Sequence, residues 1–315
     1  MKIKRFVCVA CMVIASACNE SEVITITVED HYRAATDSSS EQWSAVMEYT
    51  PAPGQFIGDT KTGGFTGEES TPADAVAYAT GRLTENKFVS LGGFGGYIVV
   101  GFDHCIDNVS GYDIAVRGNA FNGSSEPGIV WVSQDTNGNG KADDEWYELA
   151  GSDTMDETTI RHYSVTYYSP SEDGQAVKWI DSEGAEGEID YLKAYHSQPS
   201  YYPTWISKDS YTLTGTRLAA RNYDQSGKGT MWVQPAYDWG YADNFSAEDY
   251  VEDDKTLNLF DLAKAIDADG MTAVLNYVDF VKVQTACNTK SGWLGEQSTE
   301  VLDFLDYGLM LKRNM

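Results

Sequence analysis

Histidine is scarce in this chain of 315 residues, which contains only four of them. No two lie at the i, i+4 spacing that places a pair of zinc ligands on one helix face. The Gly-x-Ser-x-Gly motif of serine hydrolases is absent as well. Asp103 and His104 are adjacent on an expected strand, where neighbouring side chains point to opposite faces, so we do not expect them to act together. These features argue against catalysis.

Basic residues are also few. The chain has 22 Lys and Arg against 48 Asp and Glu, a formal net charge of −26 at pH 7. A surface of this sign repels the phosphates of nucleic acids and the headgroups of anionic lipids. Nucleic acid and a charged membrane surface are therefore excluded as expected partners.

Residues 1–17 have the layout of a secretory signal peptide. Three basic residues precede an apolar run from Phe6 to Ile14, which is too short to span a bilayer. The segment Ala15-Ser16-Ala17-Cys18 resembles a bacterial lipobox, in which the cysteine thiol is acylated and becomes the mature N-terminus. We therefore predict lipidation of Cys18, which makes contact with the membrane through the lipid anchor. Ordinary secretion after cleavage at the same place is the alternative.

Residues 18–44 are predicted to be the acylated N-terminus and a tether. They are polar and charged apart from the alternating run Val23–Val28, which could instead add an edge strand. Loss of the signal removes three of the 22 basic residues, so 19 remain against 48 acidic ones and the charge becomes −29. The acidic residues after Cys18 resemble the export signal of surface lipoproteins in anaerobic gut bacteria. This resemblance implies a cell-surface location on the outer membrane.

Two of the five cysteines leave with the signal and a third carries the lipid. Cys105 and Cys287 remain in the body of the protein. They could form one disulfide in an oxidising setting, or stay two buried free thiols in an anaerobic one. The sequence leaves both possibilities open.

The segment Asp135–Glu145 has the spacing of a calcium-binding loop. Oxygen-bearing side chains occupy its first, third, fifth and ninth positions, and Gly140 at the sixth permits the sharp turn that such a loop needs. Strand-like runs on both sides indicate a structural staple for Ca²⁺, and a solvated turn without an ion is the alternative. The predicted ligands are Asp135, Asn137, Asn139, the carbonyl of Lys141, Asp143, Asp144 and Glu145.

Short strand-like runs separated by turn residues recur along residues 45–315, which we take as one domain. This cadence predicts an all-β fold, an antiparallel β-sandwich or jelly roll with two short helices. One helix is expected from Pro72, capped by Thr71, to about Arg82, and the other from Leu259 to Ala268, capped by Asn258. The expected strands are Phe88–Leu91, Tyr97–Phe102, Tyr112–Arg117, Gly128–Ser133, Trp146–Leu149, Tyr163–Tyr168, Val177–Ile180, Tyr211–Leu218, Met231–Val233, Val278–Thr285 and Val301–Leu305.

A series of segments carries a family resemblance through its order. The series consists of Ser90–Asp103, Gly118–Phe121, Ser125–Val130, Asp135–Leu149, Tyr202–Trp205, Tyr211–Gly215 and Val278–Thr285. Together they resemble the "cell surface protein" lipoproteins of anaerobic gut bacteria, some of which occur beside a PKD-like domain. The resemblance covers about Glu48 to Asp306 and implies a calcium-containing jelly roll of carbohydrate-binding type. It also implies an association with TonB-dependent uptake systems, including those for cobalamin. A separate PKD-like module is not recognisable in this chain.

Two clusters of aromatic residues lie in sequence rich in proline and glycine. Flat rings with polar tips suit stacking on sugar rings or on a planar macrocycle. Core filling is the alternative, because aromatic side chains of a β-sandwich are usually buried. The predicted ligand-binding residues are Tyr201, Tyr202, Trp205, Tyr237 and Trp239.

These features together predict a surface lipoprotein that binds an extracellular ligand without catalysing a reaction. The ligand is expected to be a glycan or a scarce cofactor such as a corrinoid (cobalamin), passed to a TonB-dependent outer-membrane transporter. A secreted glycan-degrading enzyme is the alternative, and an adhesin or structural surface protein is a third possibility. An enzyme would use two of the available carboxylates. These are Asp103, Asp113, Glu126 and Glu148, of which Glu126 is also a possible extra ligand of the Asp135 loop.

Overall fold

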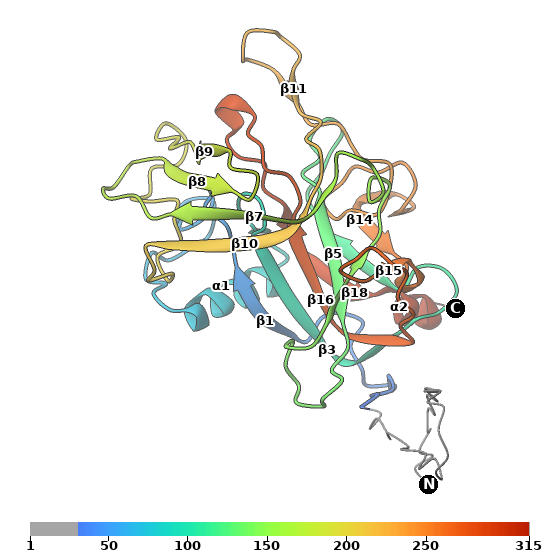
Figure 1. Cartoon of the computed structure of the whole chain (residues 1–315). Helices are drawn as coiled ribbons and strands as arrows, with labels where there is room; N and C mark the ends of the chain where they lie inside the picture. Colours follow the sequence, from blue (N-terminus) through green and yellow to red (C-terminus); the bar gives the residue numbers. More distant parts are fainter. Residues whose placement is uncertain (1–30, 315) are drawn as a thin grey trace, which may run out of the picture.

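The computed structural model describes residues 31–314, so the predicted signal peptide, Cys18 and the run Val23–Val28 lie outside the described part. The regular structure consists mostly of antiparallel strands (Figure 1). The elements are β1 Ala45–Thr50, α1 Pro72–Thr84, β2 Val89–Ser90, β3 Tyr97–Asp107, β4 Ile114–Arg117, β5 Gly128–Ser133, β6 Trp146–Leu149, β7 Ile160–Tyr168, β8 Val177–Asp181, β9 Glu186–Ile189, β10 Ser210–Arg217, β11 Tyr223–Asp224, β12 Trp232–Val233, β13 Tyr250–Val251, β14 Asp254–Phe260, η1 Leu262–Lys264, β15 Ala265–Ile266, β16 Tyr277–Thr285, η2 Gly292–Leu294, β17 Glu300–Val301, β18 Asp303–Asp306 and α2 Tyr307–Asn314.

Two sheets form a sandwich, as predicted. One has six strands in the order β1-β3-β16-β5-β6-β15, and the other has four in the order β13-β14-β4-β18. Apolar side chains of both sheets belong to one buried core cluster, with Val100 and Val281 from the first and Val116 and Phe304 from the second. Burial of these surfaces is the main stabilising contribution to such a fold. The all-β prediction is confirmed.

A third sheet, with the order β10-β7-β8-β9, lies beside the sandwich at the upper left of Figure 1. Val165 and Tyr167 of β7 form a second core cluster with Phe94, which precedes β3. The hydroxyl of Tyr167 donates to the carbonyl oxygen of Phe94 at 2.9 Å. This third sheet therefore packs onto the body and does not form a separate domain.

The helix predictions were half right. Helix α1 begins at Pro72, and the Thr71 hydroxyl accepts the N–H of Asp74 at 3.2 Å, as its predicted cap role requires. The predicted helix Leu259–Ala268 is wrong: its residues form the end of β14, η1 and β15. The reason is that Asn258 is fully buried on β14 and its Oδ1, the atom that would cap a helix, accepts the N–H of Asn244 at 3.3 Å. Helices α1 and α2 are both too short to cross a membrane, and no other described segment qualifies.

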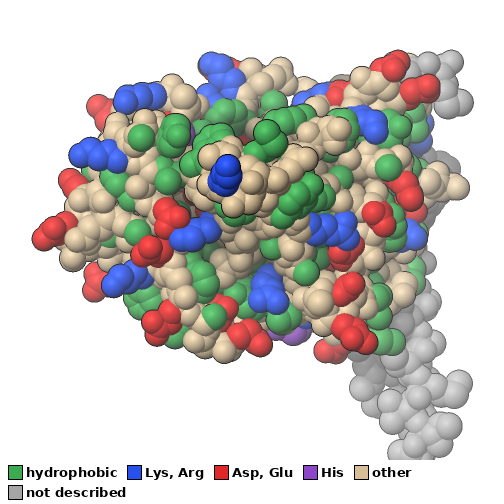
Figure 2. Space-filling model, turned by 90° about the horizontal axis from the view of Figure 1, so that it is seen from above, with side chains coloured by type: hydrophobic (Ala, Val, Ile, Leu, Met, Phe, Trp, Pro, Cys, Tyr) green, Lys and Arg blue, Asp and Glu red, His purple; other side chains and the backbone are tan. Residues whose placement is uncertain are grey.

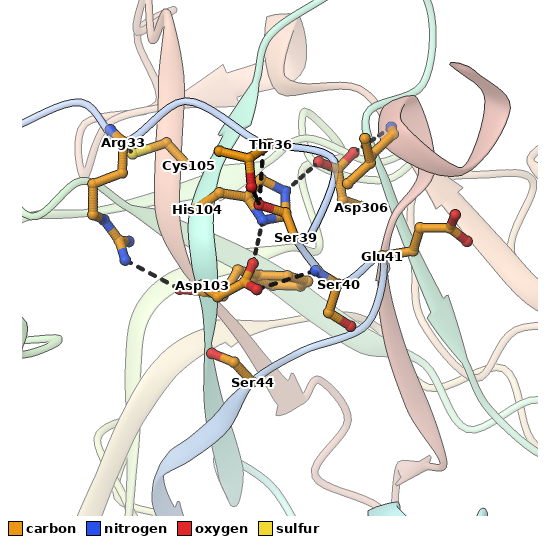
Figure 3. Close-up of polar contacts among 12 residues, drawn as sticks. Arg33, Thr36, Ser39, Ser40, Glu41, Ser44, Asp103, His104, Cys105 and Asp306 are labelled. Carbon is orange, nitrogen blue, oxygen red and sulfur yellow. Dashed lines mark hydrogen bonds and ion pairs between the residues drawn. The ribbon is translucent and has the colours of Figure 1, made fainter. Parts of the chain in front are cut away.

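Residues 31–44 lie along the body, so this part of the predicted tether is not a free linker. Arg33 forms an ion pair with Asp279 at 2.8 Å. Its N–H donates to Cys105 Sγ at 3.1 Å, and its carbonyl accepts the N–H of Cys105 at 2.8 Å (Figure 3). Ser40 N–H donates to Asp103 Oδ2 at 3.1 Å. The sequence looked like a tether because its contacts are made by backbone and polar groups, which leave no hydrophobic pattern.

The expectation that Asp103 and His104 point apart is wrong. His104 Nδ1 lies 2.6 Å from Asp103 Oδ1, and its Nε2 lies 2.8 Å from Asp306 Oδ2 (Figure 3). Strand β3 bulges here, because Gly101 pairs with Phe280 and Ile106 with Val278, so four residues lie opposite one. The bulge interrupts the alternation of side chains. Burial lowers the pKa of His104, but the hydrogen bonds to both carboxylates outweigh it and raise that pKa.

Cys105 and Cys287 are both buried free thiols. Cys105 Sγ donates to Asp279 Oδ1 at 2.9 Å, whereas Cys287 Sγ lies 3.4 Å from the hydroxyl of Tyr237. Each thiol therefore has its own polar partner. Of the two possibilities left open by the sequence, the structure has two free thiols.

Candidate functional site

The predicted calcium loop follows β5 and winds around the carboxylate of Asp135. The two oxygens of this carboxylate accept the N–H of Asn139 at 3.0 Å and the N–H of Gly140 at 2.9 Å. Gly140 has a φ of 72°, a left-handed conformation that turns the chain back on itself. Asn139 Oδ1 accepts the N–H of Lys141 at 2.7 Å, which continues the winding. The backbone thus takes the shape that the spacing predicts.

Four of the other proposed ligands gather at the same loop. Asn139 Nδ2 donates to Asp143 at 3.1 Å, and Asn137 Nδ2 donates to Asp144 at 3.2 Å. Glu145 differs, because its carboxylate accepts the hydroxyl of Tyr147 at 2.9 Å. The loop therefore brings the carboxylates and side-chain amides of the proposed ligands together, with the amide nitrogens toward the carboxylates, and the ion itself stays a prediction.

The predicted aromatic ligand site is corrected by burial. The side chains of Tyr201, Tyr202, Trp205 and Tyr237 are between 1% and 6% exposed, so their faces pack the core, as the alternative stated. Tyr201 and Tyr202 belong to the cluster beneath the third sheet. Only Trp239 is half-buried, and it lines a separate hollow with Tyr112 and Lys264. Turn-rich sequence did not keep these rings out of the core.

A cleft of about 460 Å³ combines aromatic side chains with carboxylates, and we call it the acidic cleft. Its volume is in the range of about 300–1,000 Å³ that is typical of small-molecule sites. The cleft draws on segments far apart in sequence, namely those before β5, after β9 and around η2. Its lining includes Phe121, Glu126, Tyr195, Trp293, Glu296 and Glu300.

Three aromatic side chains form the rim of the acidic cleft. Phe121 is 64% exposed, Tyr195 is 58% exposed and Trp293 is 45% exposed. The rings of Tyr195 and Trp293 lie 6.1 Å apart between centroids. Exposed hydrophobic side chains of this size that gather at a cavity indicate a binding surface. The molecule's end seen from above mixes hydrophobic groups with charges of both signs (Figure 2).

Three carboxylates converge at the floor of the acidic cleft, where Glu126 and Glu300 line it and Asp243 lies next to them. Glu126, Asp243 and Glu300 each offer an oxygen, and these oxygens lie within 4.8 Å of one another. Asp243 is fixed by the N–H of Asn119 at 2.8 Å and that of Glu300 at 2.9 Å. Glu126 Oε1 accepts the side chain of Gln234 at 3.1 Å and the N–H of Ser298 at 3.2 Å. The group is therefore held in place by the surrounding backbone and amide donors.

No basic side chain offsets these charges. The ion pairs found within residues 31–314 include none of the three carboxylates. Burial, together with repulsion from Glu126, raises the pKa of Asp243 to about 8. Burial and the charges of Glu126 and Asp243 raise the pKa of Glu300 well above its ordinary value. The cluster therefore holds protons or needs a cation at neutral pH.

Glu296 is a fourth acid of the same cleft. Its Oε1 accepts the N–H of Gln55 at 2.7 Å, whereas Oε2 is buried without a hydrogen-bond partner among residues 31–314. Burial raises the pKa of Glu296 to about 8, and the charge of Glu126 adds to the effect. Glu296 is therefore mostly protonated at neutral pH and can donate a hydrogen bond into the cleft.

Of the carboxylates at this site, the sequence pointed to Glu126 alone. Glu126 was named as a carboxylate, but its suggested role in the Asp135 loop is wrong, because β5 separates the two by its six residues, roughly 20 Å of strand. Asp243, Glu296 and Glu300 carry no motif spacing. Trp293 offered a signal, since it stands in the turn-rich run Ser291–Gly295, the kind of sequence chosen elsewhere for its aromatics.

The remaining candidate acids are structural. Asp113 accepts the N–H groups of Val109 and Leu262, both at 2.8 Å, and Glu148 accepts the hydroxyl of Thr216 at 2.5 Å.

Comparison with models of known protein families finds no match, and comparison with curated proteins finds none either. The geometry of the acidic cleft is therefore the basis for assigning a function.

Proposed function

We propose that this protein binds a glycan in the acidic cleft without hydrolysing it. The observation that carries the proposal is the combination of an exposed aromatic pair, Tyr195 and Trp293, with buried acids at the floor of one cleft. Aromatic faces stack on the apolar faces of sugar rings, and carboxylates accept hydrogen bonds from hydroxyl groups. A polyhydroxylated ligand satisfies both kinds of group at once.

The unpartnered acids favour a glycan over a corrinoid. Glu296 Oε2 and Glu300 Oε1 are buried and have no hydrogen-bond partner within residues 31–314. A buried polar atom without a partner costs roughly 1–3 kcal/mol, so a ligand that supplies the missing partner gains affinity. Closely spaced sugar hydroxyls can both donate and accept, which suits buried acids in either protonation state. A corrinoid remains the other ligand class to be tested.

The setting that we propose for this binding is the outside of the outer membrane. The lipobox-like segment before Cys18 supports a lipid anchor, and a TonB-dependent transporter is the proposed receiver of the ligand. Calcium in the Asp135 loop is proposed to stiffen the far end of β5 and not to touch the ligand. The strand separates that loop from Glu126 and the acidic cleft.

A calorimetric titration of the full chain with a glycan panel and with cobalamin tests the proposal. Trp293→Ala removes the rim ring, and Tyr168→Ala is a matched control because Tyr168 is 44% exposed and lies on β7, outside the cleft. We expect a glycan to bind the wild type and the control equally. Loss of about 1.4 kcal/mol of stacking in Trp293→Ala weakens binding about tenfold. Equal affinity in all three proteins places the site elsewhere, and binding of cobalamin alone refutes the glycan.

Hydrolysis of a glycan is the second candidate function, and one observation favours it. Glu296 has a pKa of about 8 in a cleft that also contains Glu126 and Glu300, and a protonated acid beside carboxylates is the arrangement of a glycosidase. Release of reducing ends from a bound glycan, abolished in Glu296→Gln, would establish it. Unchanged substrate after prolonged incubation with a tightly bound glycan supports binding alone.

A further inference from the structure

We propose that Glu126, Asp243 and Glu300 bind a divalent cation of the Ca²⁺ class at the floor of the acidic cleft. This site is separate from the Asp135 loop and does not depend on what organic ligand the cleft takes. Three features of the cluster point to a bound ion, namely the spacing of its oxygens, an unpartnered buried oxygen and the missing counter-charge.

The spacing of the three oxygens suits a single ion. Calcium binds oxygen at about 2.3–2.6 Å, so two oxygens on the same ion lie no more than about 5 Å apart. One oxygen from each of Glu126, Asp243 and Glu300 meets this limit, because all three lie within 4.8 Å of one another. The residues come from three separate segments, the chain before β5, the loop between β12 and β13, and β17. Their proximity is therefore a result of the fold and not of closeness in sequence.

One buried oxygen of the cluster has no partner. Glu300 is 3% exposed, it lines the acidic cleft, and its Oε1 accepts no hydrogen bond within residues 31–314. Buried side-chain acceptors in native proteins almost always have a donor or an ion. Glu126 and Asp243 each place an oxygen within 4.8 Å of one oxygen of Glu300, and neither carboxylate offers a donor when ionised. A cation supplies the missing partner of Glu300 and a counter-charge for all three carboxylates.

The donor set selects the class of ion. All three side chains are carboxylates, hard ligands that prefer Ca²⁺ or Mg²⁺, and no thiol or imidazole belongs to the cluster. Ca²⁺ takes about six to eight oxygens in a flexible shell, so water or a ligand hydroxyl from the open cleft completes the coordination. The lining of the cleft contains no Lys or Arg to compete for the carboxylates.

Counting bound ions tests the site. The full chain is stripped with a chelator and titrated with CaCl₂ alone, with the number of bound ions measured by equilibrium dialysis. Glu300→Gln removes one ligand charge at constant shape. Glu126→Gln is a second variant, because an amide oxygen can still accept the bonds from Gln234 and Ser298. Glu157→Gln is the matched control, since Glu157 is exposed and takes part in none of the ion pairs found within residues 31–314.

We expect each cleft variant to bind one Ca²⁺ fewer than the wild type, and the control to bind the same number. In the cleft variants the ion of the Asp135 loop should remain bound. In Asp143→Asn the ion of the loop should be lost and the ion of the cleft should remain, so a double variant of Asp143 and Glu300 should bind two Ca²⁺ fewer than the wild type. Equal numbers of ions in the wild type and in both folded cleft variants would refute the site and leave protons as the partners of these carboxylates. Glycan binding that survives such a result would still support the proposed function.

Discussion

Replacement of Glu300 by Gln should change the stability of the fold in opposite senses with and without calcium. Two ionised carboxylates whose oxygens lie within 4.8 Å of each other repel by about 3 kcal/mol or more at the effective dielectric constant of about 20 that suits protein sites. Protonation relieves part of this below pH 8, because the pKa of Asp243 is raised to about 8 by burial and by Glu126. At pH 9 in chelator, Glu300→Gln should therefore raise the unfolding free energy by roughly 2–3 kcal/mol.

The pH dependence has a definite sign. A carboxyl whose pKa is raised holds its proton longer in the folded state than in the unfolded state, so the folded state binds more protons between the two pKa values. Its stabilising effect is complete below the ordinary pKa of 3.8 and is lost as the pH rises toward about 8. The stability of the wild type in chelator should thus fall from pH 5 to pH 9, and Glu300→Gln should flatten that fall.

Thermal unfolding with and without excess calcium measures this prediction. A gain of about 2–3 kcal/mol raises the melting temperature by roughly 5–10 °C for a domain of this size. With calcium bound the wild type regains its stability, and Glu300→Gln gains less from the ion. Glu157→Gln should match the wild type in both buffers. A variant that is less stable than the wild type in chelator at pH 9 would refute the repulsion argument.

Three further predictions concern the scaffold. His104→Gln should flatten the change of stability between pH 6 and pH 8 in thermal melts, because the raised pKa of His104 gives a contribution that is complete below its ordinary value of 6.5 and lost as the pH rises through the folded pKa; an unchanged slope contradicts this. Thr71→Ala should lower the unfolding free energy by about 1 kcal/mol in urea, through loss of the helix cap, and no change would show that Asp74 alone suffices. Arg33→Ala should speed hydrogen exchange in residues 34–44, since its ion pair with Asp279 holds the segment; identical exchange would mean that the backbone contacts are enough.

The sandwich was predictable because local sequence specifies it. The strands Gly128–Ser133 and Trp146–Leu149 have the predicted bounds, and α1 begins at its proline with the expected cap. β-branched and aromatic runs between turn residues have few other ways to bury their side chains. The loop at Asp135 was predictable for the same reason, since the spacing of its oxygens is a property of one continuous segment.

The acidic cleft was not predictable, because no continuous segment contains it. Asp243 and Glu300 meet Glu126 only after strands distant in sequence have paired. The bulge in β3 that joins Asp103 to His104 likewise depends on its partner strand β16. The role of the two aromatic clusters depended on burial, which the sequence does not show. Tyr201 and Tyr237 are each 1% exposed, although their local sequence resembles that of exposed aromatic residues.

A crystal structure of the full chain with a bound oligosaccharide and calcium tests the central claim most directly. We expect a sugar ring stacked on Trp293, with hydroxyl groups facing Glu296 and Glu300, and density for an ion among the three carboxylates of the floor. An oligosaccharide bound at any other face, with the cleft filled by water alone, would contradict the account.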